Sequence, residues 1–156
     1  MASLKSPKTS HEAATRRIAD QCIAVRLRML NRVITGVYDE AIRPLGVTAG
    51  QVNILVTVET LGKPRQADVG RGLYMEKSTL SRNVERLRRK GWLEVTEQGE
   101  DHARHLAVTA RGRTVIDRAM PLWEKAQTQA RRIIGTAGED ALRAAADGLW
   151  KGEPPD

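Results

Sequence analysis

Hydrophobic side chains recur at helical spacing along the early part of the chain. Between Ala14 and Ala41 they form two rows, the first at Ile18, Cys22, Val25, Met29, Val33 and Val37 and the second at Leu27, Leu30, Ile34, Tyr38 and Ala41. A helix of this length extends over roughly 40 Å, which exceeds the ~30 Å width of a small domain. Because two apolar rows need two partners, we expect part of the rod to lie against another subunit.

Shorter helices are predicted in the middle of the chain. A proline and a glycine near residue 45 end the first helix, and Thr48 with Gln51 three residues later has the form of a capping box that opens the next one. The pattern then predicts a short helix over residues 66–73, a break, and a stronger helix over residues 77–90.

After residue 90 the apolar spacing changes from helical to alternating. Apolar residues at positions 93 and 95, and again at 106 and 108, alternate with other residues and predict a two-stranded hairpin with residues 97–103 as its loop. Thr109 is a suitable cap for a second long helix through Ile133, which we expect to be kinked or restarted at Pro121 because proline lacks an N–H. A last amphipathic helix follows Gly138.

The order helix, break, helix, hairpin is the outline of a winged helix-turn-helix. The predicted fold class is therefore mainly α with a small β-hairpin wing, flanked by long N- and C-terminal helices. Within residues 77–90, one side of the helix is apolar and the opposite side polar, the first formed by Leu80, Val84 and Leu87 and the second by Ser78, Arg82, Glu85 and Arg89. Gly70 has no side chain and should let the two central helices cross closely.

The charge balance indicates the class of partner. The chain holds 26 Lys and Arg against 19 Asp and Glu, a net charge of +7, and residues 77–90 alone carry six bases and one acid. Such a helix suits a polyanion. With 3% aromatic residues the chain lacks the stacking platform of single-stranded nucleic-acid modules, so duplex DNA is the predicted partner.

In the major groove, the first turns of helix 77–90 would offer the base edges a basic and hydroxyl-bearing set: Lys77, Ser78, Thr79, Ser81 and Arg82. Arg86, Arg89 and Lys90 lie further along and are expected at phosphates. In the hairpin loop, His102 and Arg104 are candidates for the minor groove, which the acids at positions 100 and 101 oppose.

These residues resemble a known family. The stretch from Leu45 to Gly112, with LGVTAGQ, ADVGRGLYMEKSTLSRNVERLRRKGWLEV and LAVTARG, is similar to the MarR family of bacterial and archaeal transcriptional regulators. The segments RLRMLNRVITGVYDEAIRPLGVT and RAMPLWEKAQ on either side also match common family patterns. The resemblance implies a homodimer that binds pseudo-palindromic operators, usually as a repressor released by a small ligand or by oxidation.

The resemblance also implies a division of the chain. The winged helix-turn-helix would occupy residues 45–113, and the first and last helices, residues 14–44 and 114–150, would form the dimerisation region. We expect flexible tails at residues 1–13 and 151–156.

The family's recognition-helix motif falls on the same set from Lys77 to Arg82, and its preceding acidic residue falls on Glu76. The wing tip departs from the family pattern of Asp, a variable residue and Arg. This chain has Glu100, Asp101 and His102 there, so the minor-groove arginine is missing from its usual place and Arg104 is the candidate replacement.

The one cysteine, Cys22, lies in the first helix, as does the peroxide-sensing thiol of some family members. We interpret it as a small core residue beside Ile18 and Val25, because unpaired cysteine is among the most buried residue types. A thiol-based redox-sensing repressor is the alternative. In it, Arg26 one turn later would lower the pKa of the thiol if both side chains faced one cavity.

Other protein classes lack their signatures in this sequence. No run approaches the roughly 18 apolar residues of a membrane helix and no signal peptide is evident, so we expect a cytoplasmic protein. His102 and His105 lack the spacing of a metal site, and no phosphate loop or nucleophile motif is present, so we expect no metal, cofactor or catalysis. A winged helix that binds only other proteins is a further alternative, against which the one-sided basic helix argues.

Overall fold

The computed structural model describes residues 7–98 and 103–150, in two units of which the first ends at Gly36 and the second begins at Val37. The first unit contains α1 (Pro7–Gln21) and most of α2 (Ile23–Ile42). Helix begins at Pro7 rather than at Ala14, so the tail predicted over residues 1–13 is helical from Pro7 onward.

The uninterrupted helix predicted from Ala14 to Ala41 is wrong, because the helix breaks at Cys22. The guanidinium of Arg26 lies at this break. It donates hydrogen bonds to the backbone carbonyls of Asp20 and Cys22, the latter at 3.3 Å, and the Cys22 carbonyl also accepts the backbone N–H of Arg26 at 3.4 Å.

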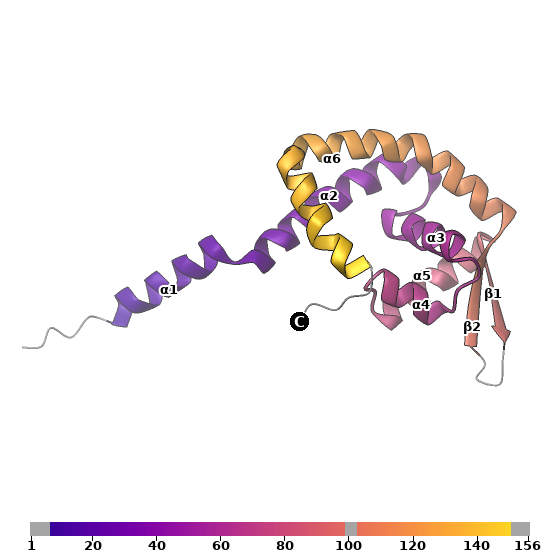
Figure 1. Cartoon of the computed structure of the whole chain (residues 1–156), viewed down its shortest axis with the longest axis horizontal. Coiled ribbons are helices and arrows are strands. Elements are labelled where there is room, and N and C mark those ends of the chain that lie inside the picture. The colour runs from indigo at the N-terminus through magenta and orange to yellow at the C-terminus, as the bar shows by residue number, and fades with distance from the viewer. Residues whose placement is uncertain (1–6, 99–102, 151–156) are drawn as a thin grey trace, which may run out of the picture. The chain divides into compact units, whose positions relative to one another are not determined.

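The second unit holds the end of α2, a short 3-10 helix η1 (Arg43–Leu45), and the elements α3 (Ala49–Leu61), α4 (Gln66–Gly72), α5 (Lys77–Arg89), β1 (Leu93–Gln98), β2 (Ala103–Val108) and α6 (Ala110–Trp150). Figure 1 shows α3, α4 and α5 grouped beside the hairpin, with α6 running along α3. This arrangement confirms the predicted fold class of a mainly helical winged helix-turn-helix.

One core joins the three central helices to the wing. Its buried apolar side chains are Ile54, Leu55, Val58, Val69, Leu80, Val84, Leu87, Leu93, Leu106 and Val108. Burying one such side chain stabilises the fold by about 1.5–3 kcal/mol. In the antiparallel hairpin Leu93 pairs with Val108 and Val95 with Leu106, so the alternating pattern turns one face of the wing toward the helices.

The predicted capping box at the start of α3 is confirmed. The N–H of Gln51 donates to Oγ1 of Thr48, and the N–H of Thr48 donates to Oε1 of Gln51, both at 3.3 Å. Two N–H groups that the first helical turn leaves without partners are thereby satisfied.

The hairpin strands are longer than the sequence predicted. Residues 97, 98 and 103 belong to strands rather than to the loop, and residues 99–102 lie outside the described structure. The other edge of β2 is also paired, because the N–H of Leu106 donates to the carbonyl of Pro64 at 3.0 Å and Arg65 bridges His105. The chain before α4 therefore anchors the wing.

Helix α6 starts at the predicted cap, where the N–H of Gly112 donates to Oγ1 of Thr109 at 3.0 Å. The helix is not restarted at Pro121, since helical conformation continues through this residue. Pro121 and Asp117, one turn earlier, are not buried, so water can reach the carbonyl that loses its donor.

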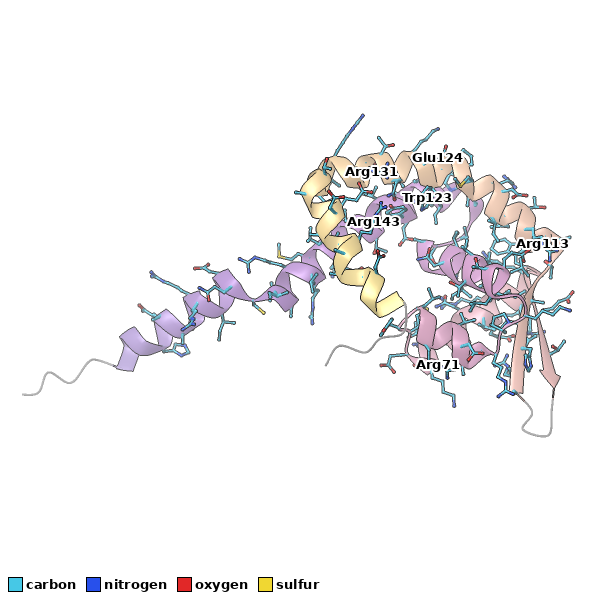
Figure 2. All side chains as sticks on the ribbon, viewed as in Figure 1. Arg71, Arg113, Trp123, Glu124, Arg131 and Arg143 are labelled. Atoms are coloured by element: carbon cyan, nitrogen blue, oxygen red, sulfur yellow. The ribbon has the colours of Figure 1, made fainter. Side chains whose placement is uncertain are left out.

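The helical run of α6 is interrupted instead at Gly135, with φ 70° and ψ 168°, a conformation that only glycine adopts readily. The last helical stretch thus starts after Gly135 rather than after Gly138. Arg131 and Glu139 form a two-pronged ion pair across the bend (Nε–Oε2 2.9 Å, Nη2–Oε1 3.0 Å), and Arg143 adds a contact to Glu139 at 3.2 Å. Figure 2 shows Arg131 and Arg143 on the two sides of this bend.

Among the described residues, no single helix has both the length and the apolar composition to cross a membrane. Residues 23–45 taken together with 49–61 pass that test only as a pair bent by 79°.

Candidate nucleic-acid interface

The position of α5 is set by its close crossing with α4. A Cβ added at Gly70 would lie 3.2 Å from Cδ2 of Leu80, so the glycine is what allows this approach, as the sequence predicted. Leu80, Val84 and Leu87 are at most 2% exposed, which confirms the predicted inner side of α5.

The opposite side of α5 faces outward. Lys77, Ser78, Arg82, Arg86 and Arg89 are not buried, and they include four cations that the sequence assigned to DNA on this helix. Thr79 and Ser81 are half-buried. The outward side is thus basic and hydroxyl-bearing, the chemistry that suits phosphates and base edges.

Two predicted base-contacting hydroxyls already have partners within the chain. Nε2 of Gln66 in α4 donates to Oγ of Ser81 at 2.9 Å, and Nη2 of Arg82 donates to Oγ1 of Thr79 at 3.4 Å. A hydroxyl accepts and donates at once, so both remain able to donate to a further acceptor.

The one acidic side chain of α5 forms an ion pair with an arginine of the same helix. Glu85 accepts two hydrogen bonds from Arg88, at 2.9 and 2.8 Å. The hydrogen bond from Arg88, with the positive charges of Arg88, Arg89 and Arg104, lowers the pKa of Glu85 and keeps it ionised. The remaining bases of the helix therefore supply its outward positive charge.

The wing brings a further cation toward α5. Arg104 lies on β2 opposite Glu97, is half-buried, and is near enough to Glu85 to lower its pKa. His102, Glu100 and Asp101 lie outside the described residues, so the minor-groove prediction for His102 stays a prediction.

His105 lies on β2 with Nδ1 3.1 Å from the carbonyl oxygen of Ala103. Within the described ranges, no group of three or more His, Cys, Asp or Glu residues could hold a metal ion.

The winged region and its wing are similar in sequence to known proteins. Residues 45–104 match the sequence profile of the MarR family. A curated relative, the uncharacterised HTH-type transcriptional regulator YwoH of Bacillus subtilis, is 31% identical over 77 residues, which cover 49% of this chain and 56% of YwoH. The match thus spans about half the length of that relative.

Solved structures extend the similarity over most of the chain. The Mycobacterium tuberculosis transcriptional regulator MosR, crystallised in complex with DNA, is 27% identical with a TM-score of 0.72, covering 85% of this chain and 97% of MosR. The matched region of this chain, residues 45–104, therefore belongs to the MarR family. An E. coli MarR mutant complexed with operator DNA shares the fold, with 17% identity and a TM-score of 0.74 over 85% of this chain and 96% of that one. Membership of a family of transcriptional regulators agrees with the expectation that the chain is not an enzyme.

Two contacts of this chain could not be predicted from its sequence. Lys90, assigned there to phosphate, directs its Nζ to the carbonyl of Gly46 and lies 4.5 Å from the ring centroid of Trp92. Gln51, predicted only as part of the capping box, also donates to Asn83 of α5 at 3.3 Å. No periodicity signals either contact, because the partners are 44 and 32 residues apart in sequence.

Cys22 is half-buried at the break between α1 and α2. Arg26, the residue proposed to act on its thiol, donates instead to backbone carbonyls of Asp20 and Cys22. Ile18 and Val25, its predicted apolar neighbours, are 66% and 47% exposed in the single chain. Whether the thiol is structural or redox-active therefore stays a prediction.

Proposed function

We propose that this chain is a homodimeric regulator of transcription that binds duplex DNA in a sequence-specific manner, as a repressor that a small ligand releases. The DNA-binding region is assigned to residues 45–113 and the dimerisation region to residues 14–44 and 114–150. A regulator of this kind would act in the cytoplasm and need no cofactor.

One observation carries the DNA-binding proposal. Helix α5 packs its apolar side at 0–2% exposure, while its outward side presents Lys77, Arg82, Arg86 and Arg89. The major groove admits one α-helix, and arginine forks onto guanine O6 and N7. We assign Lys77, Ser78, Thr79, Ser81 and Arg82 to base edges and Arg86 and Arg89 to phosphates, with Arg104 and His102 of the wing at the minor groove. The DNA complex of MosR, at 27% identity, supports DNA binding by this fold, and the assignment of individual residues rests on the exposure and charge of α5.

The proposal of a homodimer rests on the uncovered apolar rows of the first unit. Ile18 and Met29 of the first row and Leu27 of the second are 66%, 63% and 51% exposed in the single chain. Several large apolar side chains exposed to water along α1 and α2 are typical of a surface that a partner covers. A two-fold partner would place two copies of α5 about one helical turn of DNA apart, roughly 10 bp between half-sites.

The test combines assembly with DNA binding. Sedimentation equilibrium should give twice the chain mass, and selection from genomic fragments should enrich a pseudo-palindrome bound at least about a thousandfold more tightly than random duplex. A monomer that binds all fragments equally, or none, would refute the proposal. Binding to a protein partner without DNA would favour the protein-interaction alternative instead.

Release by a ligand is tested on the enriched operator. A small molecule that acts as inducer should dissociate the complex and raise the midpoint of thermal unfolding, because a ligand of the folded state stabilises it. The resemblance to the MarR family is the support for this part of the proposal.

A further inference from the structure

Residues 46–51, between η1 and the first turn of α3, contact α5 at two places, one at its C-terminal end and one in its middle. At the C-terminal end, Lys90 caps α5 and donates from Nζ to the carbonyl of Gly46. Its ammonium group also lies over the ring of Trp92, 4.5 Å from the centroid. Lys90 therefore has two partners on the scaffold, although it belongs to the basic stretch that the sequence assigned to DNA.

In the middle of α5 the contact is made by two amides. Nε2 of Gln51 donates to Oδ1 of Asn83 at 3.3 Å, and Nδ2 of Asn83 donates to the carbonyl of Thr79 at 3.0 Å. Gln51 is 7% exposed, and its Oε1 accepts from the N–H of Thr48. Both ends of each amide are thus occupied, which defines the orientation of the two side chains.

The same segment is attached to the end of α2. Oδ1 of Asp39 accepts from the N–H of Ala49 at 2.7 Å, at the first residue of α3. Residues 46–51 are therefore hydrogen-bonded to α2 on one side and to α5 on the other.

We propose that Lys90 and Asn83 are positioning residues, which hold α5 at two points against residues 46–51, and that Lys90 makes no phosphate contact. The inference deepens the proposed function and rests on it. Contacts to base edges require placement within about 0.5 Å, whereas phosphate contacts from long side chains tolerate small shifts of the helix. Loss of either anchor should therefore reduce sequence discrimination more than general affinity for DNA.

Lys90→Met is the main variant, because it keeps the length of the side chain and removes the charged donor. We expect affinity for the operator to fall by about tenfold, equivalent to one charge-assisted hydrogen bond, while affinity for random duplex and the slope of log affinity against log salt stay unchanged. Arg89→Met is the matched control, because Arg89 is the neighbouring residue and is exposed, as Lys90 is. It should weaken both kinds of binding and reduce the slope by about 0.9 for each phosphate that the arginine had neutralised. Lys90→Arg, which can donate to Gly46 and stack over Trp92, should restore discrimination.

Asn83→Ala tests the second anchor and should also lower operator affinity with an unchanged salt slope. Circular dichroism and thermal unfolding show whether each variant is folded. If Lys90→Met does not fold, Asn83→Ala alone tests the proposal that α5 is held by positioning residues. A salt slope for Lys90→Met that falls as much as that of Arg89→Met would overturn the inference and leave the proposed function intact. Absence of DNA binding by the unsubstituted chain would refute the proposed function itself.

Discussion

Gly112, in the first turn of α6, touches the start of the wing. A Cβ added there would lie 2.2 Å from the carbonyl oxygen of Trp92 and 2.7 Å from Cγ1 of Val108. The Trp92 oxygen also accepts the N–H of Thr109 at 3.1 Å, so it belongs to the joint between β1 and α6. Gly112→Ala should therefore push the wing away from α6.

Two opposing contributions decide whether Gly112→Ala raises or lowers the free energy of unfolding. Alanine in a helix interior is more favourable than glycine by about 1 kcal/mol. Ordinary carbon–oxygen contacts begin at about 3.3 Å, so a packed backbone segment would have to move by about 1 Å. Overpacking of this kind costs about 3 kcal/mol, which exceeds the helical gain, so we expect a net loss of about 2 kcal/mol.

Thermal unfolding at equal protein concentration measures this loss. For a chain of this size, about 2 kcal/mol corresponds to a midpoint lower by about 4–8 °C. Gly50→Ala in α3 is the matched control, because nothing lies within 4 Å of its added Cβ, and it should raise the midpoint slightly. A Gly112→Ala midpoint at or above that of the unsubstituted chain would show that the wing yields without cost, and would refute the reasoning.

Three further predictions concern DNA contact, the thiol and acid stability. Arg82→Ala should cost about 1–3 kcal/mol of operator binding and relax the base preference at one position per half-site in a binding selection, and an equal loss on every sequence would reassign Arg82 to phosphate. Cys22→Ser should leave DNA binding intact, and loss of release by peroxide in that variant would show that the thiol is a redox sensor. The hydrogen bond from Arg131 lowers the pKa of Glu139, so the stability from this pair is complete above the unfolded pKa of about 4.3 and is lost as the pH falls through the lower folded value. Glu139→Gln should flatten the acid limb of the stability curve below about pH 5, and identical acid limbs would contradict a stabilising role for the pair.

The elements around α5 could be predicted from the sequence because their signals are local. Apolar spacing defines the buried side of α5, the reciprocal pair Thr48 and Gln51 defines the start of α3, and alternation defines the hairpin. The charge of residues 77–90 indicates that α5 presents a basic surface to solvent. The missing side chain at Gly70 indicates that α4 and α5 pack closely. Each depends on neighbours within one or two turns, or on the absence of an atom.

Tertiary structure alone decided where the long helices break and what holds α5 in place. Proline at 121 is a general helix breaker, yet the helix continues there, in a turn that is exposed to water. The interruption lies instead at Gly135, beside an ion pair from Arg131 to Glu139. Lys90 resembles one more basic residue of a DNA-binding stretch until its contact with Gly46 is visible. Contacts between residues tens of positions apart leave no periodic trace, since each depends on where the core has placed two distant backbones.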